Sequence, residues 1–159
     1  MKTLDGLNDA ISNEACFHGM NPEHLAILSN GAKEVQFKAG EVLFREGEPA
    51  NQFYLIEKGK VVLEAHEPAN GTTLVQTLGA GDVLGWSWLF PPFAWHLQAR
   101  AVEPTNAIIL NGARLLVTAE RNHEFGYELM KRVAEVVIRR LQATRKQLLA
   151  LQTETVLEG

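Results

Sequence analysis

One stretch of the sequence, GWSWLFPPFAWHLQAR at residues 85–100, gathers aromatic and polar side chains that together can bind a small molecule. It contains all three tryptophans of the chain. Its flat apolar side chains are Trp86, Trp88, Phe90, Phe93 and Trp95. Its polar side chains are Ser87, His96, Gln98 and Arg100. Aromatic faces with a few convergent polar groups are typical of ligand pockets, but the same tryptophans can also fill a hydrophobic core. The stretch therefore has two interpretations, a pocket lining or a plain core.

No other pattern in the sequence indicates catalytic or metal chemistry. Cys16 is the only cysteine, which excludes an intrachain disulfide and a four-thiolate iron–sulfur centre. Cys16 and His18 are a conceivable pair of haem ligands, although a solvated His18 is the simpler interpretation. The remaining histidines are His24, His66, His96 and His123. They lack metal-ligand spacing, and the chain has no nucleophile motif or P-loop. We therefore expect neither enzyme activity nor a metal.

The composition is typical of a single globular domain, with 46% apolar and 21% charged residues. No apolar run reaches the roughly 18 residues of a membrane span, and no secretion signal begins the chain. A cytoplasmic protein without membrane contact is therefore expected. Residues 1–120 carry 8 Lys and Arg against 14 Asp and Glu, a net charge of −6, and residues 121–159 carry 7 against 5, a net of +2. Neither part is basic enough to predict direct DNA binding.

Short strands are expected to position the aromatic stretch. Runs rich in β-branched and aromatic residues lie at 35–37, 42–44, 53–56, 61–63, 72–78, 98–102 and 105–110. Asn70-Gly71 is the strongest hairpin signal, because both central residues of a type I′ turn need a positive φ. Asn21, followed by Pro22, is a favourable N-cap for a short helix before the strands. So many short strands at close spacing indicate a small antiparallel barrel or jelly roll.

The C-terminal part is expected to form one long helix. It begins after Asn122, runs without proline to about Thr153, and at about 1.5 Å per residue spans roughly 45 Å. One set of its residues recurs at the alternating spacings of a coiled-coil seam: Met130, Ala134, Val137, Leu141, Thr144, Leu148 and Leu151. A second apolar face can dock on the barrel: Leu129, Val133 and Val136. Two apolar faces and the excess length favour a homodimer over a helix that lies wholly on its own barrel.

Four segments match, in order and in spacing, those of one known family. They are AGEVLFREGE at 39–48, FYLIEKGKV at 53–61, LGAGDVLG at 78–85 and RRLQATR at 139–145. Together they resemble the cyclic-nucleotide-binding domain of the catabolite activator and fumarate–nitrate regulator family, over roughly residues 20–152. The resemblance implies a mainly β fold with flanking helices, an eight-stranded antiparallel β-roll of the double-stranded jelly-roll type. Residues 1–120 would form this roll with an N-terminal helix, and residues 121–159 the dimerisation helix, within one structural domain.

The resemblance also implies a ligand site, from which this sequence departs. In relatives that bind cyclic AMP, helix-end N–H groups and an arginine hold the phosphate after the position of Gly85, and a glutamate holds the ribose. Here Trp86 stands at the glutamate position, and Trp95 or His96 at the arginine position. Because a hydrogen bond to a charged group contributes about 1.5–3 kcal/mol, losing both pairs lowers the affinity by roughly two to four decades. We therefore expect that cyclic AMP is not bound in the usual way.

Further site residues are expected on the long helix. Thr144 matches the residue that reaches the base in cyclic-AMP-binding relatives, and Arg140 and Arg145 flank it, either to pair an anion or as solvated charges. The full set of expected ligand-binding residues is Gly85, Trp86, Ser87, Trp88, Trp95, His96, Gln98, Arg100, Arg140 and Thr144. The ligand is expected to be a cyclic nucleotide held differently or an aromatic, planar small molecule.

The expected function is that of a small-molecule sensor that signals through its dimer helix to a protein partner. Transcription factors of the family continue into a winged helix, whereas only residues 148–159 follow the matched segment here, so a stand-alone module is expected. The alternative is a ligand-free structural or adaptor protein whose pocket is filled by tryptophans. The sequence identifies neither the ligand nor the partner, nor whether the chain is a piece of a longer regulator.

Overall fold

The computed structural model describes residues 3–69, 71–85, 88 and 90–158, with side chains described through residue 153. Over these residues the chain forms four helices and eight strands. In order they are α1 (Leu4–Ser12), α2 (Pro22–Ser29), β1 (Lys33–Phe37), β2 (Val42–Phe44), β3 (Gln52–Lys58), β4 (Lys60–Glu67), β5 (Gly71–Gly79), β6 (Val83–Leu84), β7 (Gln98–Ala101), β8 (Thr105–Asn111), α3 (Gly112–Arg121) and α4 (His123–Glu158).

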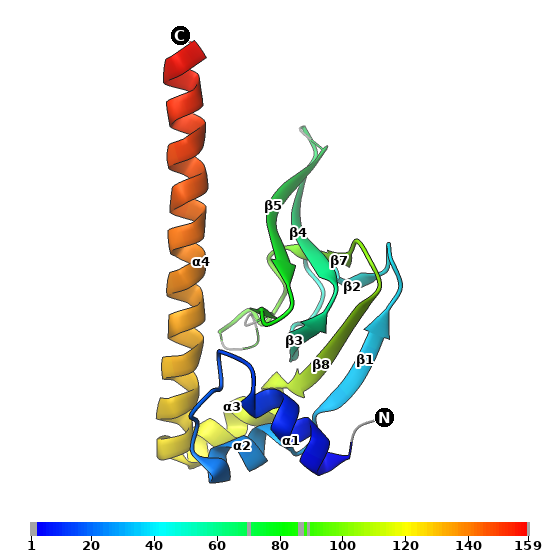
Figure 1. The fold of residues 1–159 in the computed structure, drawn as a ribbon, viewed down its shortest axis with the longest axis vertical. Coiled ribbons are helices and arrows are strands. Elements are labelled where there is room, and N and C mark those ends of the chain that lie inside the picture. Colours follow the sequence, from blue (N-terminus) through cyan, green and yellow to red (C-terminus); the bar gives the residue numbers. More distant parts are fainter. Residues whose placement is uncertain (1–2, 70, 86–87, 89, 159) are drawn as a thin grey trace.

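The strands form two four-stranded sheets that together make a β-roll beside the long helix α4 (Figure 1). One sheet has the order β1-β8-β3-β6 and the other the order β2-β7-β4-β5. Every pairing is antiparallel, for example Tyr54 with Ile109 between β3 and β8 and Val61 with Ala101 between β4 and β7. This arrangement confirms the expected eight-stranded antiparallel roll with flanking helices.

Alternation along the strands fills the inside of the roll. On β4, Val61 and Leu63 face inward, and on β7 the fully buried Ala99 does the same. These residues belong to an interior cluster that also contains Phe44, Tyr54, Ile56, Leu84 and Trp95. The interior of the roll is therefore apolar and partly aromatic.

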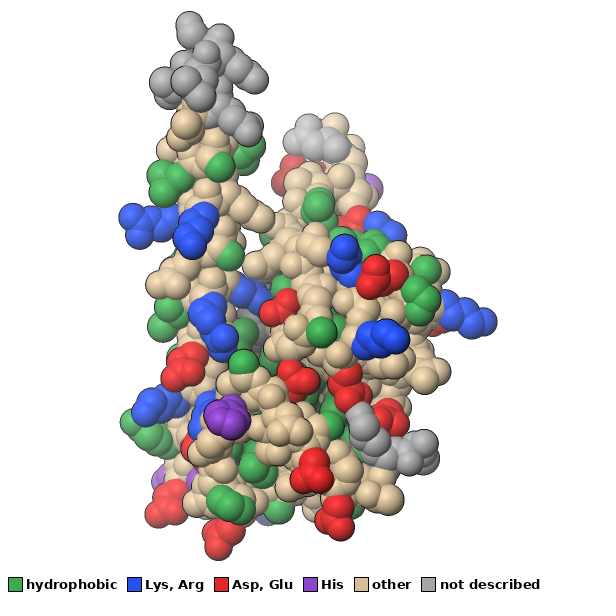
Figure 2. Space-filling model, viewed as in Figure 1, with side chains coloured by type: hydrophobic (Ala, Val, Ile, Leu, Met, Phe, Trp, Pro, Cys, Tyr) green, Lys and Arg blue, Asp and Glu red, His purple; other side chains and the backbone are tan. Residues whose placement is uncertain are grey.

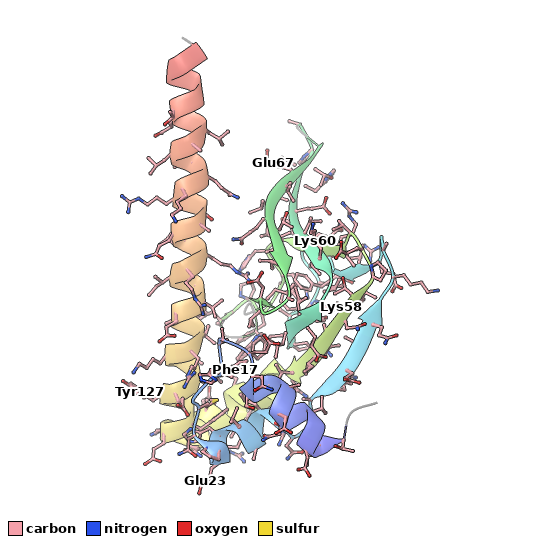
Figure 3. All side chains as sticks on the ribbon, in the orientation of Figure 1. Phe17, Glu23, Lys58, Lys60, Glu67 and Tyr127 are labelled. Atoms are coloured by element: carbon pink, nitrogen blue, oxygen red, sulfur yellow. The ribbon has the colours of Figure 1, made fainter. Side chains whose placement is uncertain are left out.

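A second apolar cluster joins the base of the roll to the helices. Helices α1, α2 and α3 gather around the first half of α4, below the sheets in Figure 1. In Figure 3, Phe17 lies between α4 and the base of the roll, and it is fully buried. The expected docking face of α4 is confirmed, because Leu129, Val133 and Val136 are buried in this cluster.

The second half of α4 continues past this base, next to the β4–β5 hairpin (Figure 1). The helix has 36 residues, a few more than expected, and its N-cap is confirmed, because Phe125 N–H donates to the Asn122 side chain. Asn21 likewise accepts from Glu23 N–H at the start of α2. Of the helices in the described ranges, none has both the length and the apolar character needed to cross a bilayer.

Candidate functional site

A small cavity lies inside the β-roll, at the point where α4 passes the roll. Strands, the segment after β6 and one helix residue line it: Phe44, Leu63, Leu84, Gly85, Trp95, His96, Leu97 and Arg140. Its volume is about 120 Å³. Pockets for drug-sized ligands usually measure roughly 300–1,000 Å³, so this cavity accommodates only a small ligand.

Trp95 belongs to the apolar cluster inside the roll. Its ring stacks on Phe44, with centroids 3.8 Å apart and an interplanar angle of 17°, and the residue is 5% exposed. Its backbone is fixed on both sides, because its N–H donates to Glu48 and its carbonyl accepts from Gly47. Trp95 is therefore both a core residue and one wall of the cavity.

Gly85 allows Trp95 this position. Its φ is +92°, and a Cβ added there would lie 2.8 Å from Cη2 of Trp95. A side chain at position 85 would be strained by the backbone and would also overlap the indole. Position 85 therefore needs a residue without a side chain for Trp95 to occupy its place.

Arg140 connects the cavity to α4. Its Nη2 donates to the carbonyl of Val83 on β6, so the guanidinium is fixed between the helix and the roll. Burial lowers the pKa of Arg140 to about 10, although the nearby charge of Asp82 acts in the opposite direction. Arg140 also lines a second cavity of about 190 Å³ between α4, β5 and β6, together with Arg139 and Asp82. One helix residue thus contacts both cavities.

The structure brings together four of the expected ligand-binding residues, namely Gly85, Trp95, His96 and Arg140. His96 is exposed at the mouth of the cavity. Trp86 and Ser87 lie outside the described residues. Four lining residues were not expected, Phe44, Leu63, Leu84 and Leu97. For Phe44 and Leu63 the signal in the sequence is strand alternation, which directs one side of each strand into the roll. Leu84 and Leu97 lie outside the strands that the sequence predicts.

The placement of Trp88 in the ligand site is corrected by the structure. Trp88 is 1% exposed and belongs to the helical cluster at the base, with its ring 5.6 Å from that of Phe53. It packs on Gly112, where an added Cβ would lie 2.5 Å from the indole. Its buried Nε1–H has no hydrogen-bond partner among the described residues. Trp88 is therefore a core residue, which is the alternative that the sequence left open.

Gln98 and Arg100 are also corrected, because they point away from the cavity. On β7 the neighbouring Ala99 is fully buried inside the roll, and side chains alternate between the two faces of a strand. Arg100 pairs with Glu64 through two hydrogen bonds of 3.0 and 3.2 Å, and Gln98 lies 3.5 Å from the same carboxylate. The hydrogen bonds from Arg100 lower the pKa of Glu64. This cluster stabilises the outer face of the sheet.

Thr144 is exposed on α4 and lines neither cavity, so the structure does not bring it to the site within one chain. Most residues of the expected dimer seam are likewise exposed in the single chain, namely Ala134, Val137, Leu141, Leu148 and Leu151. Leu141 is 67% exposed and Leu148 56% exposed. Met130 differs, because it is half-buried against the helical cluster. Figure 2 shows hydrophobic side chains at intervals along α4, beyond the part that packs on the roll.

Known proteins similar to this chain share this architecture. The chain is 26% identical over 142 residues to a CRP-like cAMP-activated global transcriptional regulator of Mycobacterium tuberculosis, which covers 89% of this chain and 62% of that protein. The chain thus spans less than two thirds of the length of this relative. A crystal structure of a cyclic nucleotide-binding protein from Geobacter metallireducens superposes with a TM-score of 0.75 at 29% identity, covering 89% of this chain and 99% of that one.

A cyclic nucleotide-binding domain from Methylobacillus flagellatus has the same fold, with a TM-score of 0.77 at 18% identity over 92% of this chain and 83% of that one. The model of the family described as the cyclic nucleotide-binding domain matches residues 34–122. These residues run from β1 through α3 and include every strand that lines the cavity. The match covers more than half of the chain, and the chain therefore belongs to the cyclic nucleotide-binding domain family.

Proposed function

We propose that this member of the family is a small-molecule sensor that does not hold cyclic AMP in the way usual for its relatives. The family and its CRP-like relatives support a regulatory module. The observation that carries the finer proposal is Trp95, one of the two residues, with His96, that the resemblance puts at the arginine position, because its side chain is buried on Phe44 inside the roll. An indole carries no charge, so a phosphate beside Trp95 would lack the arginine that pairs with it at the corresponding place in cyclic-AMP-binding relatives, and weaker pairing of a buried charge is costly.

A ligand in the cavity would affect the position of α4 through Arg140. This residue contacts the cavity from the helix and hydrogen-bonds β6 through the Val83 carbonyl. A ligand that moves the guanidinium would change the packing between β6 and the second half of α4. A helix shift of this kind can alter an interface with another molecule.

The exposed seam of α4 supports pairing with a second copy of the chain. Leu141, Leu148 and Leu151 are each more than half exposed, and they share one face of a helix that extends past its own roll. Apolar residues at alternating spacings of four and three favour a parallel coiled coil. In this proposal the cytoplasmic homodimer transmits the signal to a protein partner, without catalysis and without direct contact to DNA.

Titration calorimetry with cyclic AMP tests the proposal on the wild-type chain and on Trp95→Arg. We expect no binding at micromolar concentration by the wild type. Micromolar binding of cyclic AMP by the wild type would overturn the proposal. A gain of affinity in Trp95→Arg would support the assignment of position 95 as the phosphate position.

A ligand-free structural or adaptor protein is the second candidate, and the small volume of the cavity favours it. Thermal-shift measurements across nucleotides and small aromatic compounds separate the two functions. A sensor gains melting temperature with at least one compound, since a ligand that binds only the folded state stabilises it. An adaptor protein gains none.

A further inference from the structure

We propose that the cavity of the β-roll takes a small aromatic carboxylate, with the ring against the Phe44–Trp95 wall and the carboxylate on Arg140. This inference rests on the proposed sensor function and names the class of ligand for that site. Three properties of the cavity carry it: its charge, its shape and its size.

The charge of the lining favours an anion. Among the described lining residues, Arg140 carries a positive charge and none is a carboxylate. Arg140 lies between α4 and β6, and burial lowers its pKa although the nearby charge of Asp82 acts in the opposite direction, which means that the net effect of the surroundings disfavours its charge. An anion in the cavity would offset this cost, because a charge-assisted hydrogen bond is about twice as strong as a neutral one.

The position of Arg140 suits a carboxylate. The hydrogen bond to the Val83 carbonyl holds the guanidinium beside β6, next to Gly85 and Trp95. A guanidinium has five N–H donors in a planar fork, and two of them match the two oxygens of a carboxylate. The carboxylate of the ligand would therefore bind a guanidinium that the protein already holds in position.

The remaining lining favours a flat ring of limited size. Phe44 and Trp95 form an aromatic wall, and Leu63, Leu84 and Leu97 complete an aliphatic surround. Aromatic rings gain about 0.5–1.5 kcal/mol from such contacts beyond simple burial. A volume of about 120 Å³ suits a single ring with a short acidic arm better than a nucleoside phosphate.

Pairs of probes that differ only in charge test this inference: benzoate against benzamide, and phenylacetate against phenylacetamide. Binding to the full chain is measured by tryptophan fluorescence and calorimetry. We expect the acids to bind about tenfold or more tightly than the amides. The difference should fall to about twofold or less in Arg140→Gln and persist in Arg145→Gln, a matched control on the same helix outside both cavities. The comparison of acids with amides on the wild-type chain needs no variant. It can therefore still contradict the inference if Arg140→Gln fails to fold.

Equal binding of acids and amides overturns the inference while the sensor function stands. A preference for acids that survives Arg140→Gln in a folded protein also overturns it, because the anion then lies elsewhere. Absence of binding by all four probes overturns it as well. Micromolar binding of cyclic AMP to the wild type, measured by the same calorimetry, would by contrast overturn the proposed function itself.

Discussion

The indole of Trp95 lies flat on the ring of Phe44, with 3.8 Å between the ring centroids and 17° between the ring planes. The stack joins β2 to the segment before β7 and places two apolar rings inside the roll. Trp95 thus lines the cavity and is also part of the hydrophobic core of the roll. If the proposed function holds, the stability of the fold and the choice of ligand depend on the same residue.

Replacing Trp95 by alanine should lower the free energy of unfolding by about 3–5 kcal/mol, because the change leaves a large apolar cavity in the roll. Phe90→Ala is the control, since Phe90 is exposed in the same segment and its loss should change stability by less than about 0.5 kcal/mol. Urea unfolding of both variants measures the difference. Equal, small effects of the two changes would show that Trp95 does not pack as the structure describes.

Gly85→Ala should be more destabilising than Gly40→Ala, although both glycines have almost the same φ, +92° and +93°. At Gly40 an added Cβ meets nothing within 4 Å, so only the backbone cost of about 1–2 kcal/mol is expected. At Gly85 the Cβ also overlaps Trp95. Combining Gly85→Ala with Trp95→Ala should therefore cost less than the sum of the single changes, as measured in a double-mutant cycle. Additive effects would contradict the overlap.

Much of the fold follows from local patterns in the sequence. The strands of the roll, the caps Asn21 and Asn122 and the docking face of α4 were predicted because alternation, capping residues and helical spacing are local. Helices α1 and α3 and strand β6 were not predicted. The two residues of β6, Val83 and Leu84, are a strand only through their pairing with β3, which no local pattern encodes.

The candidate site was predicted less completely, for a geometric reason. The side chains at 85–100 do not form one surface, because after Trp95 the chain enters β7, where side chains alternate between the two faces of the sheet. Arg100 therefore reaches Glu64 outside the roll, while Trp88 packs at the base. The exposure of Thr144 follows from the docking rotation of α4, which depends on the whole helical cluster.

The pair of Glu64 and Arg100 should make stability depend on pH in the acid range. The hydrogen bonds from Arg100 hold the pKa of Glu64 below its usual value. The pair therefore stabilises the folded state above the unfolded pKa of about 4.3, and this contribution is lost as the pH falls through the lower folded value. Urea unfolding should give the wild type a higher free energy of unfolding than Glu64→Gln at pH 7. The difference between the two proteins should become smaller as the pH falls through the acid range. A difference that does not change with pH would contradict the pairing.

Leu141→Asp should convert the chain from a homodimer to a monomer, because it places an unpaired carboxylate in the apolar seam of α4 at a cost of several kcal/mol. Leu141 is 67% exposed in the single chain, so the change should leave the fold of the protomer intact. Val117→Asp is the control, since it adds the same charge at an exposed apolar position on α3, away from the seam. Light scattering measures the mass, and circular dichroism and the melting curve report the fold. We expect the mass to halve in Leu141→Asp and to stay unchanged in Val117→Asp. A monomeric wild type at micromolar concentration would exclude pairing through α4, and the exposed leucines would then need another partner.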